Sequence, residues 1–115
     1  MSDSRRESPR YVVELEGEAI LPEGHAFPVR TRNLSHNGVA FLAQVPVAAG
    51  TIVELRLALA QEGRAFSQPL GVRARIVWST PVGAEHQLGA SFLGVTNEQR
   101  SYLDLFLRYL EGGSS

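Results

Sequence analysis

Short runs of alternating apolar and polar residues recur along most of this chain, and this period of two constrains its fold more than any other feature. In the first run, which starts at Tyr11, Val13 and Leu15 alternate with Glu14 and Glu16. Such alternation places apolar side chains on one face of a strand and polar side chains on the other. Together with short apolar runs between turns, it predicts six strands, at residues 11–21, 27–34, 39–42, 53–59, 70–78 and 87–93.

Turn-forming residues separate these runs, for example at residues 22–24, 61–63 and 81–85. Six short strands with frequent turns are typical of an antiparallel barrel or sandwich, and closure into a barrel removes exposed strand edges. Within the run 70–78 the alternation predicts a core-facing set of Val72, Ala74, Ile76 and Trp78, opposite Arg73 and Arg75.

The end of the chain follows a helical period instead. Thr96 or Asn97 is a suitable helix cap, and Gln99 stands three residues after Thr96, as in a capping box. Gly112 and Gly113 are expected to end the helix. The apolar stripe at i, i+3, i+4 and i+7 consists of Leu103, Phe106, Leu107 and Leu110.

This helix has two interpretations. In the first, its apolar stripe covers an open end of the barrel. In the second, its other apolar edge, with Tyr102, Leu105 and Tyr109, meets a partner chain, such as a second copy in a homodimer.

The length of 115 residues predicts one domain, which we place at residues 11–111 after a flexible polar arm at residues 1–10. Eleven basic residues, all arginine, stand against twelve acidic ones and give a net charge of −1. This balance argues against nucleic acid as a partner, because nucleic-acid binders carry a basic excess. No apolar run is long enough for a membrane span, so we expect a cytoplasmic protein.

Nothing in the sequence indicates an enzyme, a metal site or a bound cofactor. The chain contains no cysteine, which removes disulfides and thiolate ligands. Its three histidines, His25, His36 and His86, share no metal-ligand spacing. No glycine-rich phosphate loop occurs. We therefore expect a binding protein rather than a catalyst.

Two clusters of polar residues remain. The first, at residues 5–10, is rich in arginine and precedes the first strand; the second, at residues 33–38, lies in the turn after the second strand. A solvated terminus and an ordinary turn would explain each cluster alone. In the turn interpretation, Asn33 and Ser35 cap backbone amides and Gly38 permits a positive φ.

Taken together, the two clusters resemble a family signature. Arg6-x-x-x-Arg10, followed by Asn33-x-Ser35-x-x-Gly38, resembles the paired RxxxR and [D/N]xSxxG motifs of the PilZ domain family. The resemblance extends to the late segments 75–78 and 88–92 and to the C-terminal helix, so that it covers about residues 5–110.

The resemblance implies an all-β fold with a C-terminal helix, a six-stranded antiparallel β-barrel that binds the bacterial second messenger cyclic di-GMP. It assigns Arg6 and Arg10 to the ligand's phosphate and guanine, and Asn33, Ser35 and Gly38 to the barrel-surface half of the site. Arginine chemistry agrees with this role, because a guanidinium pairs bidentately with the guanine edge and with phosphate.

Arg5 lies just outside the first motif and has two interpretations. It is a spare surface charge, or it supplies a further fork or stacking plane that favours two intercalated ligand molecules per chain. The predicted function is a cyclic di-GMP receptor that relays the messenger level to an unidentified downstream protein. The alternative is a PilZ-like adaptor for protein partners with negligible nucleotide binding.

Overall fold

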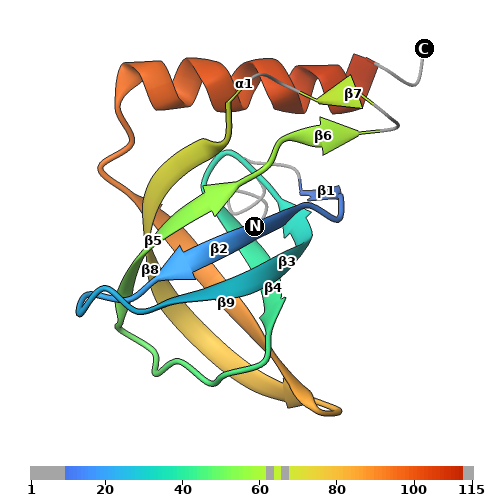
Figure 1. Ribbon diagram of the computed structural model, residues 1–115. Helices are drawn as coiled ribbons and strands as arrows, with labels where there is room; N and C mark the ends of the chain where they lie inside the picture. The colour runs from blue at the N-terminus through green and yellow to red at the C-terminus, as the bar shows by residue number, and fades with distance from the viewer. Residues whose placement is uncertain (1–9, 62–63, 66–67, 113–115) are drawn as a thin grey trace, which may run out of the picture.

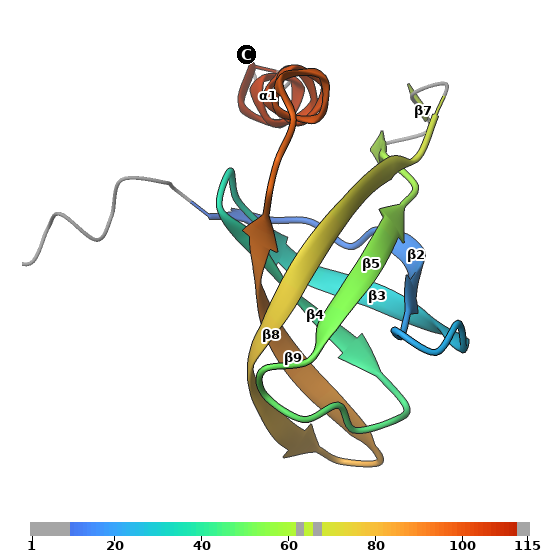
Figure 2. The ribbon, with the colours of Figure 1, turned by 90° about the vertical axis from the view of Figure 1, so that its left-hand side faces the viewer.

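The computed structural model describes residues 10–61, 64–65 and 68–112. Within them, six strands form the wall of a barrel, and one helix, α1 (Asn97–Gly112), lies across one end of it (Figures 1 and 2). The barrel strands are β2 (Glu16–Ile20), β3 (Ala26–Leu34), β4 (Gly38–Ala43), β5 (Ile52–Leu57), β8 (Leu70–Val82) and β9 (Glu85–Leu93). The remaining short strands are β1 (Tyr11–Val12), β6 (Ala60–Gln61) and β7 (Arg64–Ala65).

The sheet closes on itself. Neighbouring strands follow the order β3-β2-β5-β8-β9-β4, and β4 pairs back onto β3. Every pairing between these strands is antiparallel. Each of these six strands thus has a hydrogen-bonded neighbour on both sides, so that none of them presents a long unpaired edge. The predicted closed barrel is confirmed, and the sandwich alternative was wrong.

The first predicted strand is interrupted between β1 and β2, and the buried Thr31 of β3 bridges the gap. Its hydroxyl donates to the Val13 carbonyl oxygen at 2.6 Å and accepts from the Leu15 amide at 2.7 Å. Both Val13 and Leu15 remain buried. The alternation in the sequence therefore identified the inward-facing residues correctly, although the strand itself is not continuous.

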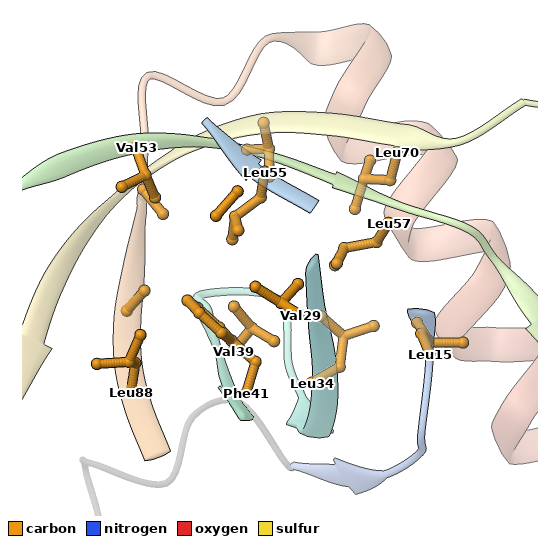
Figure 3. Close-up of a cluster of buried hydrophobic side chains, with 14 of the residues drawn as sticks. Leu15, Val29, Leu34, Val39, Phe41, Val53, Leu55, Leu57, Leu70 and Leu88 are labelled. Carbon is orange, nitrogen blue, oxygen red and sulfur yellow. The ribbon is translucent and has the colours of Figure 1, made fainter. Parts of the chain in front are cut away.

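Apolar side chains from all the barrel strands meet in the interior, where the strand alternation predicted them. Figure 3 shows this cluster, which includes Leu15, Val29, Leu34, Val39, Phe41, Val53, Leu55, Leu57, Leu70 and Leu88. Their burial removes a large apolar surface from water and supplies the main driving force for folding.

The helix begins with the predicted capping box. The Thr96 amide donates to Gln99 Oε1 at 2.9 Å, and the Gln99 amide donates to Thr96 Oγ1 at 3.0 Å. Three side chains of the predicted stripe, Leu103, Phe106 and Leu107, are fully buried against the barrel. This confirms that α1 covers the barrel end, whereas its contact with a partner chain stays a prediction.

Two features of the connections differ from the sequence-based expectation. β8 continues to Val82 and β9 begins at Glu85, so the turn between them is shorter than residues 81–85 and contains Gly83 at φ 62°. The small β6–β7 pairing was not predicted, because two-residue strands are too short to show a period. In the described part of the chain, no helix is long and apolar enough to cross a membrane.

Candidate functional site

Arg10 and Asn33, one residue of each predicted motif, meet on the outside of the barrel. Arg10 Nη1 donates a hydrogen bond to Asn33 Oδ1, across 23 residues of sequence. Arg10 directly precedes β1, and β1 pairs with the end of β3 so that Val12 stands opposite Asn33. The short β1 strand is therefore the element that brings the motifs together. Arg5 and Arg6 lie outside the described residues.

A β-bulge places Asn33 on the outer face. In the β3–β4 pairing Thr31 stands opposite Phe41 and Asn33 opposite Ala40, which leaves Arg32 as an extra residue. Unbroken alternation from the buried Thr31 would direct Asn33 into the core. The extra residue reverses the alternation, so that Asn33 is half-buried outside while Leu34 is buried inside.

A second β-bulge does the same for Trp78. Ile76 stands opposite Ala90 and Trp78 opposite Gly89, which leaves Val77 as the extra residue on β8. The expectation that Trp78 faces the core was wrong, because its side chain lies on the outer face and is 42% exposed. Bulges often redirect a side chain beside a functional site.

The indole ring of Trp78 lies directly over Gly89. A Cβ atom at Gly89 would be 2.2 Å from Trp78 Cε2, closer than any real contact. Glycine thus allows the ring to lie flat against the backbone of β9. Sequence reasoning missed Trp78 as a site residue, because its pairing with Gly89 depends on the bulge.

Between Arg10 and Trp78 the surface is hollowed into a cavity of about 330 Å³. It is lined by Arg10, Asn33, Ala40, Val77, Trp78, Gln87, Gly89, Ala90 and Ser91. Arg10 is its only charged residue among the described ones, and no carboxylate lines it. The cavity offers a flat aromatic face, amide hydrogen-bonding groups and one guanidinium, a combination suited to a planar base next to an anion.

Ser35 supports this site from within the turn after β3. It is buried, and its hydroxyl donates to the Gly38 carbonyl oxygen at 3.3 Å. The Ser35 hydroxyl oxygen, Oγ, accepts from the amides of Asn37 and Gly38, both at 3.2 Å. The single donor and both acceptor positions of the hydroxyl are thus used inside the turn. Ser35 fixes the shape of the turn, and its direct contact with a ligand stays a prediction.

Gly38 is required where β4 passes close to β9, and not for the positive φ of the turn interpretation. Among the described glycines, positive φ occurs at Gly24, Gly50, Gly83 and Gly94. The expectation of a positive φ at Gly38 was therefore wrong. A Cβ atom at Gly38 would instead lie 2.4 Å from the carbonyl oxygen of Ala90. Glycine thus allows β4 to approach β9 closely beside the cavity.

The histidine of the turn points to the helix. His36 Nε2 lies 3.1 Å from Asp104 Oδ1, and Arg108 Nε lies 3.3 Å from Asp104 Oδ2. The described part of the chain contains no group of three or more histidine and acidic side chains that could hold a metal ion.

A closed six-stranded barrel, with a helix across one end and an arginine–asparagine junction on its outer face, defines a small β-barrel domain. The family model of the PilZ domain matches residues 4–110. The chain belongs to the PilZ domain family.

Solved structures share this fold at low sequence identity. YcgR from Escherichia coli in complex with c-di-GMP superposes with a TM-score of 0.78 at 17% identity, over 96% of this chain and 47% of that one. The K. pneumonia MrkH–c-di-GMP complex superposes with a TM-score of 0.78 at 13% identity, over 96% of this chain and 54% of that one. The inhibitor of motility MotI from Bacillus subtilis superposes with a TM-score of 0.73 at 16% identity, over 90% of this chain and 50% of that one. The chain thus spans about half the length of these proteins. No curated protein matches its sequence.

Replacing Gly89 with alanine tests the packing of Trp78. The added methyl group has no room below the indole ring, so the ring is expected to swing outward and its fluorescence emission to shift to longer wavelength. Trp78 is the only tryptophan of the chain, so the signal is unambiguous. Gly71→Ala is the matched control, because nothing lies within 4 Å of a Cβ atom there. An unchanged emission spectrum in Gly89→Ala would contradict this arrangement.

Proposed function

We propose that this protein is a non-enzymatic receptor for cyclic di-GMP that passes the messenger level on to a partner protein. The observation that carries the proposal is the junction of Arg10 and Asn33 at the rim of a cavity floored by Trp78. Cyclic di-GMP combines two guanines with two phosphates, and this site offers groups for both. No cofactor other than this ligand is proposed.

Three of the lining side chains, Arg10, Trp78 and Asn33, have a chemical role toward such a ligand. The Arg10 guanidinium pairs with phosphate oxygens or with the O6 and N7 acceptors of guanine. The indole face of Trp78 stacks on a guanine ring, because every nucleic-acid base has a π-face on which an aromatic side chain can stack. The Asn33 amide, which already accepts from Arg10, keeps the guanidinium oriented toward the cavity. We assign Arg6 a second phosphate or guanine contact, and Arg5 an accessory one.

The absence of carboxylates from the described cavity lining favours an anionic ligand despite the net charge of −1. A field at one rim depends on local charges rather than on the total. Two of the similar structures, YcgR and MrkH, are complexes with c-di-GMP. These likenesses support the same ligand here.

The relay to a partner is the second part of the proposal. The outer edge of α1 provides a surface for it, because Leu105 is 56% exposed there. We assign this edge to a downstream protein or to a second copy of the chain, and we place the protein in the cytoplasm, where the messenger is made.

Calorimetric titration tests the proposed function. Cyclic di-GMP is expected to bind at least about tenfold more tightly than GMP or GTP, because it alone presents two guanines and two phosphates, and each charge-assisted hydrogen bond contributes about 1.5–3 kcal/mol. Equal affinities for all three nucleotides would contradict the assignment. No measurable binding of any of them would favour an adaptor that interacts only with proteins.

A further inference from the structure

A second cavity, of about 360 Å³, lies beside the first. Its lining comes from the turn after β3, from the end of β9 and from the first turns of α1, and includes His36, Asn37, Ser91, Phe92 and Arg100. Ser91 lines both cavities and stands opposite Gly38 in the β4–β9 pairing. Gly89, which underlies Trp78, is two residues from Ser91, or about 7 Å along the strand. The two cavities are therefore contiguous along β9.

The charges of the second cavity are suited to an anion. Arg100 supplies its positive charge, and none of the described residues that line it is a carboxylate. None of the ion pairs between described residues involves Arg100, whose side chain is exposed. Asp104 lies near His36, but its two oxygens are held by His36 and Arg108. The guanidinium of Arg100 is thus free of a described acidic partner beside an open cavity.

The charge of its lining distinguishes this cavity from three other cavities on the described surface. Three further cavities are each lined by at least one carboxylate, from Glu16 and Glu85, from Glu98, or from Glu14. A dinucleotide with one guanine on Trp78 must place its other half along the neighbouring surface. The direction along β9 toward Ser91 leads to a cavity with cationic lining, whereas the carboxylates elsewhere would repel a phosphate.

We propose that the cavity between the turn and α1 is a phosphate subsite, with Arg100 as its principal binding residue. This inference rests on the proposed function, because it concerns the part of the nucleotide that extends beyond the Arg10–Trp78 cavity. The phosphate belongs to the same cyclic di-GMP molecule or to a second one. In either case Arg100 joins the ligand directly to α1, and the turn is joined to the same helix by His36 and Asp104.

Titration of Arg100→Gln with cyclic di-GMP tests this subsite. Loss of a charge-assisted contact is expected to weaken binding about tenfold or more. Arg100→Lys keeps the charge but not the planar fork, so its affinity is expected to lie between those of the unaltered protein and Arg100→Gln. Arg56→Gln is the matched control, because this exposed arginine of β5 lies outside both cavities. If the phosphate belongs to a second molecule, the binding ratio of the unaltered protein is two and falls to one in Arg100→Gln. If it belongs to the first, the ratio is one in both proteins.

Two outcomes would overturn the inference in different ways. If the affinity of Arg100→Gln stays within twofold of that of Arg56→Gln and the two variants have the same binding ratio, the subsite is wrong while the receptor assignment stands. If the unaltered protein binds no cyclic di-GMP, both the proposed function and the subsite are overturned. Far-ultraviolet circular dichroism of each variant confirms that the barrel and α1 are intact.

Discussion

Arg10→Ala is expected to weaken cyclic di-GMP binding by about 10- to 150-fold, the equivalent of about 1.5–3 kcal/mol for lost hydrogen bonds to a charged group. The guanidinium stands at the rim of the Trp78 cavity and is its only charged group among the described lining residues. Its removal also leaves Asn33 Oδ1 without the described donor. Calorimetric titration of the variant beside the unaltered protein measures the effect.

Two companion variants separate the role of Arg10 from a general effect of charge. Arg10→Lys keeps the charge but loses the planar fork, so we expect only partial recovery of affinity. Arg56→Ala removes an exposed arginine outside the cavity and is expected to bind normally. Equal binding by Arg10→Ala and the unaltered protein would remove Arg10 from the site.

Gly38→Ala is expected to lower the free energy of unfolding by about 1–3 kcal/mol, the range for overpacking a well-packed interior. The added methyl group would lie 2.4 Å from the Ala90 carbonyl oxygen, a backbone atom that moves only if β4 and β9 separate. All six residues of β4 are buried, so such a separation would disturb the core as well.

Urea unfolding of Gly38→Ala measures this loss, with Gly71→Ala as the control in open space. The contrast with Gly89→Ala is informative, because there the obstructing atoms belong to a half-exposed side chain that can move away. We therefore expect a small stability change at Gly89 and a large one at Gly38. A Gly38→Ala midpoint equal to that of Gly71→Ala would contradict the close strand approach.

The sequence predicted the barrel because its alternation is a local property. Val53, Leu55 and Leu57 repeat every second residue and are all buried in β5. The start of the helix was also predictable from the sequence, because Thr96 and Gln99 form their capping hydrogen bonds within four residues. The resemblance to the PilZ motifs assigned Arg10 and Asn33 to one site, and a hydrogen bond joins the two side chains.

The parts that were missed depend on register between strands that are distant in sequence. Trp78 continues the apolar alternation of β8, and only the extra residue Val77 opposite β9 turns it outward. In the sequence Gly38 resembles an ordinary turn glycine, because its close approach to the Ala90 carbonyl oxygen of β9 exists only in the folded barrel. Ser35, by contrast, caps backbone amides as the turn interpretation expected, and its contact with a ligand stays a prediction. Bulges and close backbone approaches leave no periodic signal in one chain.

Fluorescence of Trp78 during titration with cyclic di-GMP tests most directly whether the ligand occupies the cavity between Arg10 and Trp78. Because Trp78 is the single tryptophan of the chain and lines this cavity, a saturable change in tryptophan emission reports on the cavity. We expect such a change, with a midpoint that matches the calorimetric Kd and moves to higher ligand concentration in Arg10→Ala. Heat of binding with no change in Trp78 emission would show that the ligand binds elsewhere on the protein.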